Sequence, residues 1–321
     1  MTYLIFNGVI FLIIGIFLII LSSNLAVVHS IKLSSALGIS SLIVGIVFVG
    51  IGTNMPEILN SIISCALGHG DIDAGDSIGS VLAQLTLVFG LIPIIGRRFF
   101  KIDKKEILII GSCVILALFL VYAVVEKGFF TRLDALFLIL STPIYMLITK
   151  LFSSKGTLDD IKKETIEIKY KDKKSKKFHL FIAILGFIGV GGGSYIIINS
   201  IIELSSVLNI YEYNISFYIA AIGTSLPELS VDITAIRKKE YKLLIGDIFG
   251  SCIIDASLSI SIGQFFFPQS VSADLASTTI IFTLIASSLV IFLLVIRGKV
   301  DRKSGIIFII IYFFSYLLFF I

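Results

Sequence analysis

Acidic side chains stand inside two strongly apolar stretches of this chain, and the two stretches repeat each other. Residues 52–57 (GTNMPE) recur as residues 223–228 (GTSLPE), and residues 75–80 (GDSIGS) recur as residues 246–251 (GDIFGS). Both pairs share an offset of 171 residues, so the repeat aligns without a gap. A charged side chain in hydrocarbon is costly, and one that is kept there marks a functional site. The duplication therefore predicts a transporter whose two halves meet at an ion site.

Each first motif places a proline directly before a glutamate. Pro56 and Pro227 have no N–H, and their rings press on the carbonyl of the glycine four residues back. A helix broken in this way leaves backbone carbonyls free, which is tolerated at membrane depth only where protein, water or an ion satisfies them. We therefore expect carbonyls, a Thr hydroxyl and the carboxylate of Glu57 or Glu228 to gather at each break. A packing kink is the alternative, and a carboxylate at both breaks argues against it.

The second motif adds oxygen-bearing side chains along one helix face. The spacing i, i+4, i+8 puts three positions of each copy on the same side: Asp76, Ser80 and Gln84, and Asp247, Ser251 and Asp255. Gly79 and Gly250 would let these helices approach the breaks closely. Ser and Gly at this spacing also suit plain packing, but their correspondence across the repeat favours ligands. Asp232 follows Glu228 by four residues and is interpreted as a pathway residue; its counterpart, Ser61, is neutral.

The composition predicts an all-α polytopic membrane protein. Of its 321 residues 57% are hydrophobic and only 15% are charged, and the mean hydropathy is +1.05. A soluble protein with buried helices would need amphipathic faces and more charge. Apolar runs long enough to cross a bilayer recur along the chain, at residues 3–28, 35–67, 77–96, 106–125, 133–151, 178–202, 216–236, 243–265, 275–296 and 305–321.

The distribution of basic residues predicts the topology. Lys and Arg follow the odd-numbered segments, whereas the opposite loops are acidic or balanced. Positively charged loops stay cytoplasmic, so both termini should lie outside the cell membrane. Five helices in residues 1–151 and five in residues 178–321 would then form two inverted repeats, joined by a charged cytoplasmic linker at residues 152–177. The net charge of +4 is thus a topology signal and not a sign of a nucleic-acid partner. The first segment has no cleavage site and reads as a retained helix.

No basic residue is available to neutralise the acidic positions. The sequence contains no Lys or Arg in residues 33–96, 178–236 or 243–296. Carboxylates that converge in such an environment must bind cations or take up protons. An all-oxygen ligand set suits hard ions, Ca²⁺ above all. The three cysteines form neither a soft-metal motif nor a disulfide framework, and no cofactor is expected.

At these motifs the chain resembles the sodium/calcium exchangers of the cation/calcium antiporter superfamily, whose two alpha-repeats read GTSLPE and then GNxIGS. The resemblance implies ten helices and exchange of Ca²⁺ for Na⁺ by alternating access. It implies a central Ca²⁺ site made by Glu57, Glu228 and the carbonyls of Thr53 and Thr224. It also implies Na⁺ sites shared among Ser225, Ser80, Ser251 and the carbonyls of Gly50 and Ala221. Gln84 and Asp255 would take the remaining central position.

Four positions depart from the family pattern and leave the coupling ion open. Asn54 replaces a serine, Gln84 replaces an asparagine, and Asp76 and Asp247 both replace asparagine. Na⁺ is favoured because the Ser hydroxyls are intact, and hydroxyls can ligate Na⁺ without losing a proton. The added carboxylates could carry protons, which keeps a Ca²⁺/H⁺ antiporter on the same fold as the alternative.

Two other classes of membrane protein fit part of this pattern, an intramembrane protease and a passive channel. Gly-Asp pairs in apolar helices also suit an intramembrane aspartyl protease, but that enzyme would not need the Pro-Glu copies. A passive cation channel would need no counter-ion, and its conduction would dissipate a Ca²⁺ gradient. The preferred prediction is a transporter and not an enzyme.

The resemblance further implies that the first and sixth segments move together. The sixth segment is rich in glycine, which could give it a smooth face for sliding, with tight packing without motion as the alternative: Gly186, Gly189, Gly191, Gly192 and Gly193. Bulky residues at Gly191 or Gly192 are expected to slow exchange. The sequence leaves the oligomeric state open.

Overall fold

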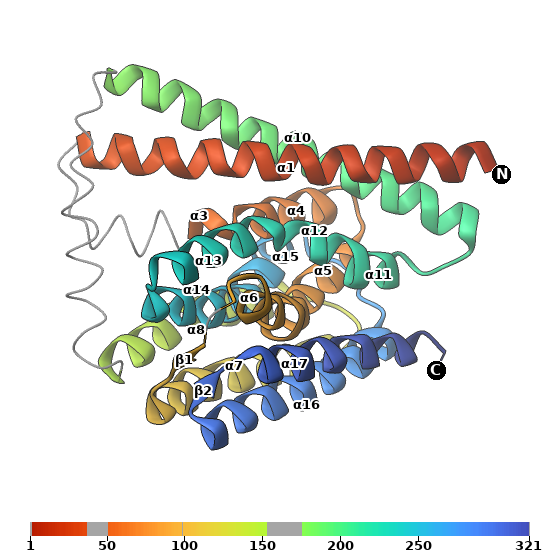
Figure 1. Cartoon of the computed structure of the whole chain (residues 1–321). Coiled ribbons are helices and arrows are strands. Elements are labelled where there is room, and N and C mark those ends of the chain that lie inside the picture. The colour runs from red at the N-terminus through yellow and green to blue at the C-terminus, as the bar shows by residue number, and fades with distance from the viewer. Residues whose placement is uncertain (1, 37–50, 98, 153–174, 321) are drawn as a thin grey trace.

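The structure, a computed structural model, describes residues 2–36, 51–97, 99–152 and 175–320, and it is helical almost throughout (Figure 1). Within these ranges, eight helical stretches are long and apolar enough to cross a membrane: Tyr3–Ser30, Gly70–Ile95, Lys104–Val125, Arg132–Thr149, Lys176–Leu208, Glu212–Arg237, Tyr241–Phe266 and Ala273–Arg297. They correspond to eight of the ten predicted segments. The other two are represented by α3 (Ile51–Thr53) with α4 (Met55–Ala66), and by α17 (Arg302–Phe314) with the 3₁₀ helix η5 (Ser315–Phe320).

Two long helices, α1 (Thr2–Ala36) and α10 (Lys176–Leu208), lie side by side across one face of the molecule (Figure 1). Both extend beyond the predicted segments 3–28 and 178–202. Small residues bring them together, because a Cβ at Gly186 would meet the Ala26 backbone nitrogen at 2.5 Å. A Cβ at Gly193 would likewise meet Ile19 Cγ1 at 2.7 Å.

Three of the five glycines predicted to form a smooth face on α10 lie at its contact with α1. A Cβ at Gly189 would meet Ser22 of α1, as one at Gly186 or Gly193 meets Ala26 or Ile19. Nothing in the described part of the chain lies within 4 Å of a Cβ built at Gly191 or Gly192, so choosing these two for bulky replacements was wrong.

Both predicted helix breaks are present. The first separates α3 from α4 at Asn54, and the second separates α12 (Ala221–Thr224) from α13 (Leu226–Lys238) at Ser225. The two residues have nearly the same conformation, with φ/ψ of −84°/9° and −81°/2°. Before α12, the chain runs through α11 (Glu212–Ile215) and the π-helix η3 (Ser216–Ala220).

The helices that carry the second motif are interrupted by π-helical turns at matched positions. The first runs through α5 (Gly70–Leu82), η2 (Ala83–Val88) and α6 (Phe89–Ile95). The second runs through α14 (Tyr241–Ile254), η4 (Asp255–Ser259) and α15 (Ile260–Phe266). A π-turn widens the helix and is often found at functional sites.

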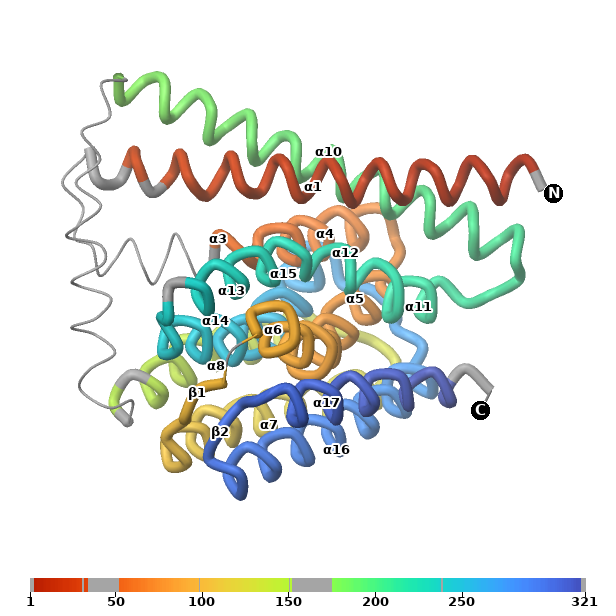
Figure 2. Tube along the Cα trace, in the orientation of Figure 1, coloured from red at the N-terminus to blue at the C-terminus, as the bar shows by residue number. Residues whose placement is uncertain are grey.

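The remaining helices that flank this centre are α7 (Lys104–Val125), α8 (Arg132–Phe152), α16 (Ala273–Arg297) and α17. Three of them, α7, α16 and α17, lie on the side away from α1 and α10 (Figure 2). Strands β1 (Phe100–Lys101) and β2 (Lys299–Val300) pair antiparallel and join the ends of α7 and α16. The start of α1 and the end of η5 lie at one end of the molecule, and the end of α8 and the start of α10 lie at the other (Figure 1).

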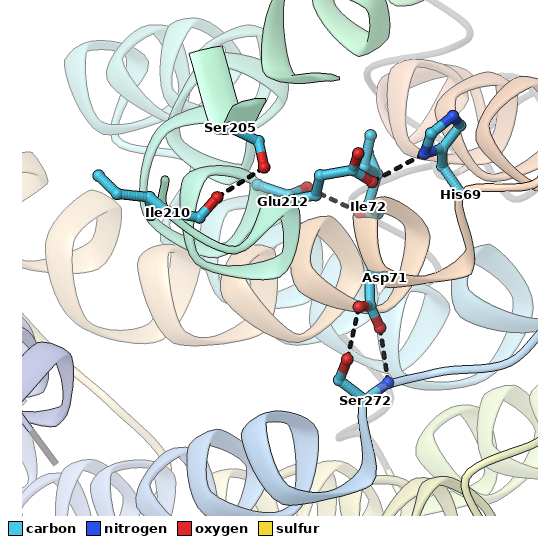
Figure 3. Close-up of polar contacts among 8 residues, drawn as sticks. His69, Asp71, Ile72, Ser205, Ile210, Glu212 and Ser272 are labelled. Atoms are coloured by element: carbon cyan, nitrogen blue, oxygen red, sulfur yellow. Dashed lines mark hydrogen bonds and ion pairs between the residues drawn. The ribbon is translucent and has the colours of Figure 1, made fainter. Parts of the chain in front are cut away.

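Polar contacts fasten the turn between α4 and α5 to the second half of the chain (Figure 3). His69 Nδ1 lies 2.7 Å from Glu212 Oε2 at the start of α11. The Asp71 carboxylate accepts hydrogen bonds of 2.6 Å from both the backbone N–H and the hydroxyl of Ser272. This end of the molecule is therefore held by contacts between the two repeats.

Candidate functional site: a buried cluster of carboxylates

Glu57 and Glu228 occupy the first turn of the helix after each break, on α4 and α13. They are 1% and 2% exposed. None of their four carboxylate oxygens has a hydrogen-bond partner among the described residues. The positive end of a helix dipole favours an anion at this position, but it does not supply ligands for four buried oxygens. The carboxylates that interact electrostatically with Glu57 are those of Glu228, Asp255 and Asp76, and all of them carry the same negative charge.

Gln84 and Asp255 lie at corresponding points of the two π-turns, η2 and η4. Both are buried. Gln84 Oε1 accepts a hydrogen bond of 3.4 Å from the Cys252 thiol. Asp255 Oδ1 accepts one of 3.2 Å from the Ser259 hydroxyl, while its Oδ2 has no partner in the described part. The π-turns could not be predicted from the sequence, because local side chains do not distinguish them from α-helix.

The predicted hydroxyl and amide positions meet across the two repeats. Asn54 Nδ2 donates to Ser251 Oγ at 3.1 Å, and Ser80 Oγ lies 3.4 Å from Thr224 Oγ1. Ser225 Oγ is buried without a partner among the described residues. The structure thus joins each break to the second motif of the opposite repeat.

Other predicted ligands lie within or beside these contacts. The Ala221 carbonyl already accepts from the Ser225 N–H at 3.2 Å and from the Thr224 hydroxyl at 3.3 Å. Thr53 is buried and accepts from Asn54 Nδ2 at 3.4 Å. Gly50, whose carbonyl was predicted to contribute, lies outside the described residues.

Asp76 is fully engaged by hydrogen bonds. Asn60 Nδ2 donates to its Oδ2 at 2.6 Å, and the Thr224 hydroxyl donates to its Oδ1 at 3.1 Å. The sequence analysis missed Asn60, which follows Glu57 by three residues on α4 and so shares its helix face. The Asp76 carboxylate therefore links α4, α5 and α12.

Asp247 has a different environment from its repeat counterpart. Its Oδ2 has no hydrogen-bond donor in the part of the chain that the structure describes. Its carboxyl interacts instead with that of Asp232 on α13. It is also the charge that acts most strongly on Glu228. Asp232 is completely buried, and the sequence identified it only as a pathway residue.

A second residue that the sequence analysis missed is Asp73, at the start of α5. It is 1% exposed, and its Oδ2 accepts from Gln264 Nε2 at 3.0 Å and from the Cys65 thiol at 3.3 Å. Gln264 Oε1 accepts in turn from the Gln269 N–H at 3.0 Å. Asp73 could have been predicted from its position three residues before Asp76, because that spacing puts both side chains on the same face of the helix.

The cluster can ligate hard cations through oxygen atoms. Among the described residues, ion pairs join Lys127 to Asp134, His69 to Glu212, and Asp301 to Arg297 and Lys299, away from the cluster. No basic side chain in the described part is hydrogen-bonded to the Glu57 or Glu228 carboxylates. Within the same residues, no three His, Cys, Asp or Glu side chains are grouped closely enough to hold a metal ion by themselves. Hydroxyl, amide and backbone oxygens would have to complete a coordination shell. The unpartnered oxygens of Glu57 and Glu228 fit such a role.

The family model described as sodium/calcium exchanger protein matches residues 7–151 and 178–321. The chain belongs to this family. The match covers both repeats and leaves out residues 152–177. As a member of the family the chain is an integral membrane cation/calcium exchanger, a transporter and not an enzyme. The protease hypothesis is set aside.

Solved structures of the sodium-calcium exchanger NCX_Mj resemble the chain over nearly its whole length. One of them, soaked with 100 mM Na⁺ and 10 mM Sr²⁺, has a TM-score of 0.62 and is 26% identical, covering 98% of both chains. Another, soaked with 2.5 mM Na⁺ and 0.1 mM Ca²⁺, has a TM-score of 0.61 and is 27% identical over 97% of this chain and 98% of that one. The predicted fold, ten helices in two repeats, is confirmed.

The chain is also similar in sequence to two archaeal proteins. An uncharacterized membrane protein of Methanocaldococcus jannaschii is 29% identical over 75% of this chain and 74% of its own length. The sodium/calcium exchanger MaX1 of Methanosarcina acetivorans is 28% identical over 41% of this chain and 38% of its own length.

Proposed function

We propose that this exchanger moves Ca²⁺ in one direction and Na⁺ in the other by alternating access, with Glu57 and Glu228 as the central Ca²⁺ ligands. The observation that carries the proposal is the group of four buried carboxylate oxygens without partners where the two helix breaks meet. Two carboxylates match the charge of Ca²⁺, which takes six to eight oxygen ligands. The carbonyls of Thr53 and Thr224 supply further ligands, and Gln84 and Asp255 take the remaining central position.

Na⁺ is bound in this proposal by the smaller oxygen ligands around the glutamates. These are the hydroxyls of Ser80, Ser225 and Ser251, the amide of Asn54, and the carbonyls of Ala221 and Gly50. Hydroxyls and carbonyls can ligate a monovalent ion without losing a proton. The unpartnered hydroxyl of Ser225, beside the second break, supports this assignment.

H⁺ is the alternative coupling ion. It is favoured by the carboxyls at positions 76 and 247, where the family pattern has amides, and by the contact of Asp247 with Asp232. The hydrogen bonds of Asp76 argue that this residue has a structural role. If H⁺ is the coupling ion, Asp232 and Asp247 are therefore better candidates than Asp76 to carry the proton.

Alternating access would arise from movement of the α1–α10 pair over the two breaks. A Cβ at Gly52 would meet Val27 of α1 at 3.0 Å, and a Cβ at Gly223 would meet Ile16 of α1 at 2.7 Å. One helix thus lies against the glycines of both breaks. Its displacement would change access to both together.

The proposed arrangement in the cell membrane has both termini outside and residues 152–177 in the cytoplasm. Residues 1–151 and 178–321 are the two inverted repeats. The chain ends lie at one end of the molecule, and the end of α8 and the start of α10 lie at the other, which supports placing the termini on one side of the membrane and the linker on the opposite side (Figure 1). The basic loops support the choice of the cytoplasm for the linker side.

The test is ⁴⁵Ca²⁺ uptake into proteoliposomes under separately imposed Na⁺ and pH gradients. An outward Na⁺ gradient, with pH and membrane voltage clamped by ionophores, should drive uptake. Protein-free liposomes and an inward Na⁺ gradient are the controls. Uptake driven only by a pH gradient, with no response to Na⁺, would reassign the protein to Ca²⁺/H⁺ exchange. In that case Asp76→Asn with Asp247→Asn should weaken the coupling to protons.

A further inference from the structure

A buried carboxylate that the proposed central site does not use lies one helical turn beyond Glu228. Asp232 is 0% exposed, and neither of its carboxylate oxygens has a hydrogen-bond donor among the described residues. The spacing of four residues puts it on the same face of α13 as Glu228. Across from it, on α14, is the carboxyl of Asp247, whose Oδ2 also lacks a donor there.

Among the described residues, no Lys, Arg or His is hydrogen-bonded to the Asp232 oxygens or to Asp247 Oδ2. The nearest basic residues in the sequence are Arg237, Lys238, Lys239 and Lys242, between the two carboxylates. By sequence, residues 216–236 and 243–296 contain no Lys or Arg. Asp232 is fully buried and Asp247 is partly buried, and two adjacent carboxylates in such surroundings repel each other and need a positive partner. A cation from solution can supply this partner.

The first repeat shows that the fold does not require this arrangement. The position of Asp232 is taken there by the neutral Ser61. The position of Asp247 is taken by Asp76, whose two oxygens receive donors from Asn60 and Thr224. The position that corresponds to Asn60 holds Val231, which has no donor in its side chain. Two differences between the repeats, Val231 in place of Asn60 and Asp232 in place of Ser61, thus accompany the change from a satisfied carboxylate to an unsatisfied pair.

We propose that Asp232 and Asp247 form a second Ca²⁺ site, separate from the central one and nearer the end of the molecule where α13 ends and α14 begins. Two carboxylates match the charge of Ca²⁺, and its flexible coordination allows water to fill the remaining positions. Asp232 lies one helical turn after Glu228 on α13, so an ion at the pair lies next to the central site. Ca²⁺ would bind at this site on its way between the solution and the central glutamates.

The transport role of this site rests on the proposed exchange of Ca²⁺, but its occupancy can be measured without transport. Equilibrium binding of ⁴⁵Ca²⁺ to the purified full-length protein in Na⁺-free detergent solution should give two sites per chain. The double variant Glu57→Gln with Glu228→Gln should keep the second site alone. Adding Asp232→Asn to it should remove that site or weaken it at least tenfold. Ser230→Ala, on the exposed face of α13, is the matched control and should change nothing.

The outcomes separate the alternatives. Asp232→Ser, which installs the residue of the first repeat, should behave as Asp232→Asn does, and thermal melting should show that both variants remain folded. Folded variants that bind as much Ca²⁺ as their parent, with unchanged affinity, would overturn the site. If such variants instead release one proton fewer on titration, the pair shares a proton. If no variant or wild type transports Ca²⁺ while the Asp232-dependent site persists, the exchange proposal fails and the second site stands.

Discussion

The two repeats carry the same motifs but place them in different surroundings. On α5, a Cβ at Gly75 would meet the Tyr213 carbonyl oxygen at 2.6 Å, and one at Gly79 would meet Ala221 Cβ at 2.8 Å. On α14, nothing described lies within 4 Å of a Cβ at the corresponding Gly246 or Gly250. The predicted close approach is confirmed for Gly79. For Gly250 it stays a prediction, because the repeat offset pairs it with residues 46 and 50, outside the described part.

The acidic residue of the second motif shows the same divergence. Asp76 accepts hydrogen bonds from Asn60 and Thr224 and holds three helices together. Asp247 faces a second carboxyl. A duplicated motif therefore does not imply a duplicated role, since the neighbours supplied by other helices decide whether a buried carboxylate is a structural link or a ligand.

The largest effect is expected where the repeats are most alike. Glu57→Gln and Glu228→Gln should each lower Ca²⁺ uptake into proteoliposomes at least a hundredfold. Each removes one charge and a possible bidentate ligand while keeping the side-chain volume. Glu126→Gln, in an exposed loop, is the control. Near-normal uptake by both variants, with unchanged melting temperatures, would contradict a central site shared equally by the two repeats.

The next largest effects should differ between the two repeats, because the matched aspartates have different neighbours. Asp76→Asn turns an acceptor toward the Asn60 amide into a donor, so it should destabilise the protein by about 1–3 kcal/mol. Asp247→Asn removes repulsion and should leave stability unchanged or raise it, while weakening Ca²⁺ binding. Thermal melting and ⁴⁵Ca²⁺ binding of both variants, side by side, are the measurements. Equal effects on both quantities would show that the two aspartates have the same role.

A smaller effect is expected on the rate of exchange. Gly186→Leu or Gly193→Leu would push α10 away from α1, since neither site has room for a Cβ. Uptake should slow about tenfold while equilibrium Ca²⁺ binding is retained. The controls Gly191→Leu and Gly192→Leu lie on the same helix where a Cβ meets nothing described. Slowing by the controls to the same extent would remove the role given to the α1–α10 contact.

The smallest effect should come from the contact that joins the repeats at the turn between α4 and α5. His69→Gln removes the pair with Glu212 (Figure 3). Both side chains are partly exposed, at 28% and 24%, so the loss in stability should be about 0–1 kcal/mol. Transport should be nearly unchanged. A loss of transport in a protein that melts normally would mean that this contact takes part in gating.

Much of the fold could be predicted because its determinants are local. The breaks at Asn54 and Ser225 follow from the prolines two residues later, whose missing N–H does not depend on the rest of the chain. The helices follow from apolar runs of membrane-spanning length. The π-turns that carry Gln84 and Asp255 could not be predicted, since they depend on how a helix packs against its neighbours.

The sequence by itself determined that this chain is a two-repeat membrane exchanger with acidic residues at two broken helices. Repetition, apolar length and the chemistry of proline are properties of the chain alone. Only the tertiary structure decided which carboxylates have partners. The Thr224 hydroxyl reaches Asp76 from 148 residues away, and Asn54 reaches Ser251 from 197. Such contacts depend on how helices pack, because a buried carboxylate is satisfied or left unsatisfied by side chains that the sequence places far from it.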